Sequence, residues 1–168
     1  EGILLKDDSS RDSFGVAHAL ADEIKSLGCE IAFFGKQSVD FDNSITGQVT
    51  AELLGYNSVS VVVDFKLEGS KITAEREIEG GREVVETELP AIITTQKGLN
   101  EPRYASLKGI MAKKKKTITE KAAAQSQKYS EIIDMNLPAS KQAGRILGTD
   151  SSAVAELVKL LREEAKVI

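Results

Sequence analysis

Apolar and polar positions alternate in blocks along the first third of the chain. Residues 3–5 form a short apolar run typical of a strand, and the apolar positions of 16–27 recur at helical spacing. The unbroken apolar run 31–34 is typical of a strand covered on both faces in a parallel sheet. These segments predict a strand–helix–strand unit, with Asp12 or Ser13 capping its helix.

The pattern then changes along the middle of the chain. Residues 46–54 repeat the helical spacing, and residues 59–65 resume as a strand. Residues 70–78 and 82–89 mix β-branched with charged side chains, as half-solvated antiparallel strands do, and glycine-containing turns precede both. We therefore predict an antiparallel β-meander appended to a parallel sheet.

The remainder carries weaker signals. We expect no regular strand beyond residue 94, a helical patch at 120–127, and a last helix capped by Ser151 or Ser152. The apolar residues of that last helix fall on one stripe, which needs a surface to cover. The prediction is an α/β domain with an extended C-terminal arm ending in a helix.

Composition and charge narrow the class of protein. A length of 168 residues can bury one ordinary core. The net charge of −4 disfavours nucleic-acid binding by the whole surface, and no apolar run is long enough for direct membrane insertion. Cys29 is the single cysteine, and the solitary His18 has no catalytic partner motif. With no activated nucleophile and no metal-ligand spacing, we expect a chain without catalytic residues or a metal site.

The polar loop after the apolar run 31–34 is a candidate nucleotide site. It joins the carboxyl end of a strand to a helix N-terminus, the edge where open α/β sheets bind ligands. Exposed amides of the first helical turn suit a phosphate, and a carboxylate could accept a ribose hydroxyl. The alternative is a plain connection that caps its own helix. The candidate residues are Gly35, Lys36, Gln37, Ser38, Val39, Asp40, Phe41, Asp42, Asn43, Ser44, Ile45 and Thr46.

A second candidate is the stretch 89–116, which reads LPAIITTQKGLNEPRYASLKGIMAKKKK. It follows an apolar strand with a polar loop and then places isolated apolar residues beside four lysines. This pattern indicates recognition by another protein. The plain alternatives are an ordinary exposed leucine and a solvated charge run. The candidate partner-binding residues are Asn100, Glu101, Arg103, Tyr104, Leu107, Ile110 and Met111, together with Glu77 in the run Arg-Glu-Ile-Glu-Gly-Gly at 76–81.

The stretches 76–81 and 89–116 closely resemble the corresponding sequences of the beta subunits of electron transfer flavoproteins. The resemblance implies one subunit of a heterodimer whose alpha subunit holds most of the FAD. Such a complex takes electrons from acyl-CoA and related dehydrogenases and passes them to a membrane quinone oxidoreductase. By the same resemblance, Leu107 anchors in an apolar pocket of the dehydrogenase, and Glu77 lies near the flavin domain of the alpha subunit.

The resemblance also implies that the loop 35–46 holds a structural AMP. Family members that bind a second FAD in this place usually carry Asp-Gly-Asp-Thr-Ala-Gln-Val-Gly-Pro, and this chain departs from that form. Residues 1–95 are then the C-terminal portion of an AMP-binding domain similar to the adenine nucleotide alpha hydrolases. Residues 96–117 are the recognition loop, and residues 118–168 an arm and helix that pack on the alpha subunit.

Family members begin with a further strand, nucleotide loop and helix before the strand at 3–5, so we expect a fragment. The expected location is the bacterial cytoplasm, or the mitochondrial matrix if the source is eukaryotic. The alternative function is a stand-alone adenine-nucleotide-binding regulator similar to universal stress proteins, which would dimerise with itself. A nucleotide hydrolase would need a glycine phosphate motif and metal carboxylates, which the sequence lacks.

Overall fold

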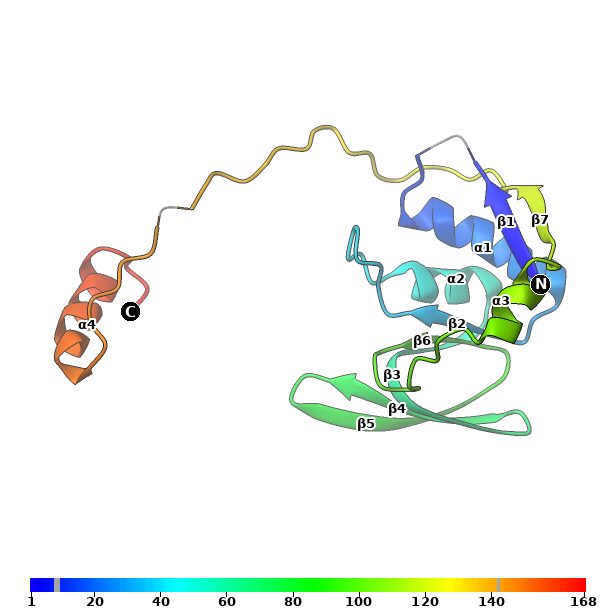
Figure 1. Ribbon diagram of the computed structural model, residues 1–168, viewed down its shortest axis with the longest axis horizontal. Helices are drawn as coiled ribbons and strands as arrows, with labels where there is room; N and C mark the ends of the chain where they lie inside the picture. Colours follow the sequence, from blue (N-terminus) through cyan, green and yellow to red (C-terminus); the bar gives the residue numbers. More distant parts are fainter. Residues whose placement is uncertain (8–9, 142) are drawn as a thin grey trace. The chain divides into compact units, whose positions relative to one another are not determined.

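The computed structural model describes residues 1–7, 10–141 and 143–168 (Figure 1). These residues form two compact units, Glu1–Glu131 and Ile132–Ile168. The division falls between Glu131 and Ile132, whereas the functional division at residues 95 and 117 stays a prediction.

The first unit is a mixed α/β structure built on a five-stranded sheet. The three parallel strands are β2 (Ile31–Gly35), β6 (Ala91–Thr95) and β3 (Asn57–Glu68), and the strand order is β2-β6-β3-β4-β5. From β3 the chain continues antiparallel through β4 (Lys71–Ile78) and β5 (Gly81–Glu88). The strand–turn–strand pattern predicted for residues 59–89 is therefore present, with β3 longer than its apolar run indicated.

One helix lies against this sheet, and a second helix packs on the first. Helix α1 (Ser13–Leu27) packs on α2 (Thr46–Leu54), which in turn lies against β6 and β3 (Figure 1). The predicted cap of α1 is confirmed, because Asp12 Oδ1 accepts the Gly15 N–H at 2.8 Å.

The contact between α2 and β6 is unusually close. A Cβ atom added at Gly47 would lie 2.5 Å from Thr94 Cγ2, so the helix can approach the strand only because residue 47 has no side chain. Thr94 itself is fully buried at this contact. The start of α2, and with it the loop that precedes the helix, is thus set directly against β6.

The apolar core lies around the middle of the sheet. It is built from side chains of β3, β4 and β6, namely Val59, Val62, Ile72, Ala74, Ala91 and Ile93. Strand β2, at the edge of the sheet, is less covered than its apolar sequence predicts, and 52% of Phe33 is exposed. The expectation that residues 31–34 are covered on both faces is therefore wrong for this structure.

Strand β1 (Gly2–Lys6) corrects two further expectations. It pairs in parallel with β7 (Ile118–Ala122) as a separate two-stranded sheet, and not within the sheet of β2. Strand β7 also shows that the expectation of no regular strand beyond residue 94 is wrong, and it occupies the start of the helical patch expected at 120–127, where no helix forms. The alanine-rich sequence favours a helix locally, but this propensity is weak beside backbone pairing with β1 and the 2.6 Å ion pair from Lys121 to Glu23.

The second unit contains a 3₁₀ turn (Ser151–Ala153) that leads into α4 (Val154–Glu163). The predicted helix is present, but its entry is capped by Asp150, whose side chain accepts the Ser152 N–H at 2.8 Å, and not by a serine. The apolar side of α4, which includes Val154 and Leu157, is exposed. Among the described residues, no helix is both long and apolar enough to cross a membrane.

Candidate functional site

The loop 35–46 leaves the carboxyl end of β2 and is folded by its own polar side chains. Gln37 Nε2 donates to Asp42 Oδ1, and Ser44 Oγ donates to Gln37 Oε1, both at 2.8 Å. Asn43 Nδ2 donates to Ser13 Oγ at 2.8 Å, which ties the loop to the first turn of α1. The loop therefore has a defined shape, held mostly by bonds between its own members.

This loop leaves the N-terminus of α2 open to an acceptor. Ile45 stands at the N-cap position and makes no side-chain capping bond, so the amides of the first turn have no side-chain acceptor there. Asp42 and Ser44 adopt positive φ angles of 52° and 54°, which turn the chain sharply before the helix. A hydroxyl and a set of backbone donors thus stand together at the strand-to-helix edge, an arrangement that suits an anion.

Carboxylates stand beside these donors. Hydrogen bonds from the Ser38 hydroxyl and the Phe41 backbone N–H hold the pKa of Asp40 below its ordinary value. Asp40 is therefore an ionised hydrogen-bond acceptor at neutral pH, as recognition of a sugar hydroxyl would require. The candidate residues 35–46 are thus contiguous at one edge of the sheet.

Glu77 and the beginnings of both candidate loops meet at the carboxyl end of β6. The Lys36 N–H donates to Thr95 O at 2.9 Å, and the Gln96 N–H donates to Val62 O at 2.9 Å. Gln96 Nε2 also donates to Glu77 Oε2 at 3.2 Å. Gln96, which no sequence pattern singles out, is thus the residue that connects Glu77 to the segment starting at 96.

The partner-binding candidates farther along that segment lie on the surface. Tyr104 is fully exposed and Leu107 is 76% exposed, so neither belongs to the core of this unit. Ile110 and Met111 are also exposed, in the short helix α3 (Leu107–Lys113). Apolar side chains therefore stand in solvent beside the cationic residues 113–116.

The side chains of Asn100, Glu101 and Arg103 make no hydrogen bond to the backbone within the described part of the chain. The shape of this segment depends instead on Ser106, whose Oγ accepts the Gly109 N–H at 3.2 Å and caps α3. Within the described part of the chain, no hydrogen bond or ion pair joins residues 100–111 to the loop 35–46.

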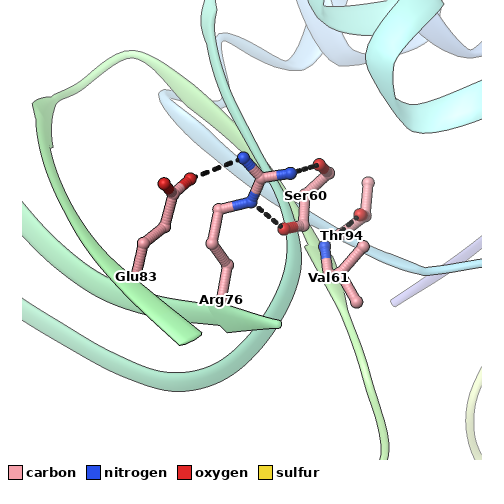
Figure 2. Close-up of polar contacts among 5 residues, drawn as sticks. All are labelled: Ser60, Val61, Arg76, Glu83 and Thr94. Atoms are coloured by element: carbon pink, nitrogen blue, oxygen red, sulfur yellow. Dashed lines mark hydrogen bonds and ion pairs between the residues drawn. The ribbon is translucent and has the colours of Figure 1, made fainter. Parts of the chain in front are cut away.

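Figure 2 shows a further polar cluster, centred on Arg76, which precedes Glu77. The guanidinium donates to Ser60 O at 3.0 Å, to Ser60 Oγ at 3.1 Å and to Glu83 Oε1 at 2.8 Å. These bonds hold a β-bulge in which Ser60 and Val61 together oppose Thr94 of β6. Val61 has a φ of 61°, which is strained for a β-branched residue, and its N–H donates to Thr94 Oγ1 at 3.1 Å.

The Arg76 cluster was not selected from the sequence. An arginine among the alternating charges of β4 has the pattern of a solvated strand face, and nothing in the order of residues places it against Ser60. A bulge in β3 also leaves no signal in a run of valines. Only the register of β3 against its two neighbours reveals it.

The described residues contain no group of three or more His, Cys, Asp or Glu side chains that could hold a metal ion. Cys29 is partly buried, and its backbone oxygen accepts the Tyr56 hydroxyl at 2.9 Å. The arrangement described above is therefore one of backbone donors, hydroxyls and exposed apolar side chains, which is suited to binding.

Comparison with known proteins identifies the family. Residues 1–126 match the family model of the Electron transfer flavoprotein domain. The chain is 37% identical over 167 residues to the "Electron transfer flavoprotein subunit beta" of Syntrophomonas wolfei. The aligned region covers 99% of this chain and 66% of that protein. It is 39% identical over 170 residues to the Bradyrhizobium diazoefficiens protein of the same name, with 99% and 67% covered. The mouse protein of that name is 38% identical over 152 residues, with 88% and 59% covered.

The chain belongs to the electron transfer flavoprotein family. The relatives named above are all beta subunits, so the resemblance drawn from residues 76–81 and 89–116 is confirmed. The chain spans about two thirds of the length of the two bacterial relatives. Flavin chemistry is characteristic of this family, whereas the AMP site, the docking residues and the cellular location remain predictions.

Proposed function

We propose that this chain serves as the beta subunit of a heterodimeric electron transfer flavoprotein. The observation that carries the proposal is the similarity to beta subunits along 99% of the chain. The partner would be an alpha subunit that holds most of the FAD. The flavin supplies the redox chemistry, and this chain positions partners around it without catalytic residues of its own.

The loop 35–46 would bind AMP as a structural ligand. Its fit to a nucleotide rests on the uncapped amides at the start of α2 and on the ionised Asp40. In this assignment the phosphate lies at the helix N-terminus, while a carboxylate accepts a ribose hydroxyl. The close contact of Gly47 with Thr94 supports the site, because it keeps the first turn of α2 against the sheet.

The segment 96–117 would be the docking element for acyl-CoA and related dehydrogenases. Leu107 is the anchor, since it stands in solvent where a partner pocket can enclose it. Burying a leucine of this size contributes about 1.5 to 3 kcal/mol, which is enough to dominate a transient interface. Glu77 would face the flavin domain of the alpha subunit, and a quinone oxidoreductase would accept the electrons.

The test is coexpression of this chain with an alpha subunit, followed by size exclusion with absorbance read at flavin wavelengths. A yellow heterodimer that releases AMP on denaturation supports both the subunit role and the nucleotide assignment. Release of two FAD per heterodimer would mean that the proposed nucleotide site holds a second FAD and not AMP. A colourless homodimer that binds ATP would favour the adenine-nucleotide-binding regulator and reject the proposal.

A further inference from the structure

A hollow of about 450 Å³ opens where the segment 96–117 leaves the sheet. Its lining combines residues of β2 and β3 with the end of β6 and the first residues of that segment, namely Phe33, Asp64, Phe65, Thr95, Leu99 and Asn100. Of these, only Leu99 and Asn100 belong to the segment proposed to dock dehydrogenases. The hollow is continuous with the partner-binding elements through Thr95, the residue before Gln96.

The apolar part of the hollow consists mainly of two aromatic rings. The rings of Phe33 and Phe65 meet edge to face, with centroids 5.2 Å apart and planes at 81°. Phe33 is 52% exposed although it lies on a strand of the central sheet. An aromatic face that stays in water at the mouth of a hollow offers a surface for a flat group or a cation.

The polar part of the hollow is an acidic acceptor. Asp64 is exposed and, among the described residues, its carboxylate takes part in no hydrogen bond or ion pair. Its neighbour across the strand pair, Glu75, is by contrast bonded to Arg82 Nη1 at 3.3 Å. Thr95 Oγ1 donates to Phe34 O at 3.1 Å, so its oxygen can still accept a bond. The hollow thus offers acceptors and one unpaired negative charge.

A guanidinium group can bind both the aromatic part and the acidic part of the hollow. It is planar and weakly hydrated, so it can stack on a phenylalanine ring while its N–H groups pair with a carboxylate. A lysine ammonium is more strongly hydrated and cannot form the two parallel bonds that a carboxylate offers to arginine. The combination of Phe33 and Phe65 with Asp64 therefore selects arginine among the side chains that a protein partner can present.

We propose that this hollow binds an arginine side chain of the alpha subunit, with the guanidinium against Phe33 and its N–H groups on Asp64. This inference rests on the proposed heterodimer. It gives that interface an ionic contact in addition to the place proposed for Glu77 opposite the flavin domain. Arginine is also one of the residues that most often dominate protein interfaces.

The test is the dissociation constant of the heterodimer, measured with this chain and its alpha subunit at 50 mM and 500 mM NaCl. Asp64→Asn is expected to weaken association about five- to tenfold at low salt, because it removes the ion pair and the charge that orients the guanidinium. The loss shrinks at high salt, since exposed charge pairs are screened. Phe33→Leu keeps an apolar side chain but removes the ring, and is expected to weaken association about threefold.

Asp22→Asn is the matched control, because Asp22 is an exposed aspartate on α1 outside the hollow. It should leave the dissociation constant unchanged. Wild-type affinity in Asp64→Asn at low salt would overturn the inference while leaving the heterodimer intact. An Asp64→Asn loss that is equal at both salt concentrations and accompanied by a lower unfolding temperature would also overturn it, as a folding effect. Failure of the wild-type chain to form a heterodimer would reject the proposed function itself.

Discussion

Asp12 Oδ2 accepts the backbone N–H of Tyr129 at 2.7 Å, which joins two residues 117 positions apart in the chain. The same oxygen accepts the Ser130 N–H at 2.9 Å, while Oδ1 caps α1 through Gly15. The Phe14 and Tyr129 rings add an edge-to-face contact with centroids 4.6 Å apart. One carboxylate thus begins a helix and also holds the last residues of the first unit against it.

Asp12→Ala is expected to destabilise the first unit by about 1 kcal/mol from the lost cap alone. It should also release residues 129–131, because their two backbone donors lose their acceptor. Hydrogen exchange at the Tyr129 and Ser130 amides measures this release. The control is Asp150→Ala, which removes a cap in the second unit. Unchanged protection of both amides in Asp12→Ala would contradict the prediction.

The same site predicts a pH dependence. Hydrogen bonds from backbone N–H groups lower the pKa of Asp12 from its ordinary value of 3.8, and the bond from Gly15 has the larger effect, followed by the bond from Tyr129. Because the pKa is lowered in the folded state, the stabilisation is complete above the ordinary value and is lost as the pH falls through the folded pKa. The difference in unfolding free energy between wild type and Asp12→Asn should therefore narrow below pH 3.8. Acid titrations of urea unfolding check this, and a constant difference from pH 6 to 2 would speak against it.

Arg76→Lys is expected to destabilise the bulge at Ser60 and Val61 by about 1 to 2 kcal/mol. A lysine cannot reproduce three donors directed at Ser60 and Glu83 from one planar group. Urea unfolding of the two proteins measures the effect. Arg82→Lys is the matched control, since Arg82 makes a single bond of 3.3 Å to Glu75 and should cost far less. An equal loss of unfolding free energy in the two variants would show that the hydrogen bonds of Arg76 to the bulge contribute no more than the single bond of Arg82.

Gly47→Ala is expected to displace α2 from β6, because the added Cβ would lie 2.5 Å from the buried Thr94 Cγ2. Overpacking of this kind costs about 1 to 3 kcal/mol. The variant should also weaken AMP retention, since residues 45–47 form the start of the helix in the proposed nucleotide site. The double variant Gly47→Ala with Thr94→Ser removes the clashing methyl and should recover part of both losses. No recovery would mean that this contact is not the cause.

Leu107→Ala is expected to lower kcat/KM for electron uptake from an acyl-CoA dehydrogenase about tenfold or more, while the flavin spectrum stays unchanged. The reason is the loss of the apolar anchor proposed for the dehydrogenase interface. Val84→Ala, which shortens another exposed apolar residue on β5, is the control and should have no effect. Normal electron transfer by Leu107→Ala would remove the anchor assignment.

Several elements could be predicted because their signals are local. The helix from Ser13 to Leu27, its Asp12 cap and its terminating Gly28 follow from periodicity and capping chemistry within one segment. The two turns at 68–70 and 79–81 follow from glycines that accept positive φ angles, as observed at Gly69 and Gly80. The family resemblance was likewise contained in two short stretches of sequence.

Elements that depend on distant partners could not be predicted in this way. The pairing of β1 with β7 and the bulge opposite Thr94 depend on which strand lies beside which. The same holds for the candidate site. The loop 35–46 could be selected from its position between a strand and a helix, whereas Gln96, Arg76 and the hollow beside Asp64 could not.

The sequence by itself therefore determined the order of most helices and strands, the turns, the candidate loops and the family. These properties arise from residues close together in the chain, through side-chain periodicity, caps and backbone preferences. Only the tertiary structure decided that the alanine-rich residues 120–122 pair as a strand, that Asp12 holds Tyr129, and that Asp64 lines the same hollow as two aromatic residues. Each of these depends on pairing and burial between segments far apart in sequence, where local propensity is too weak to decide the outcome.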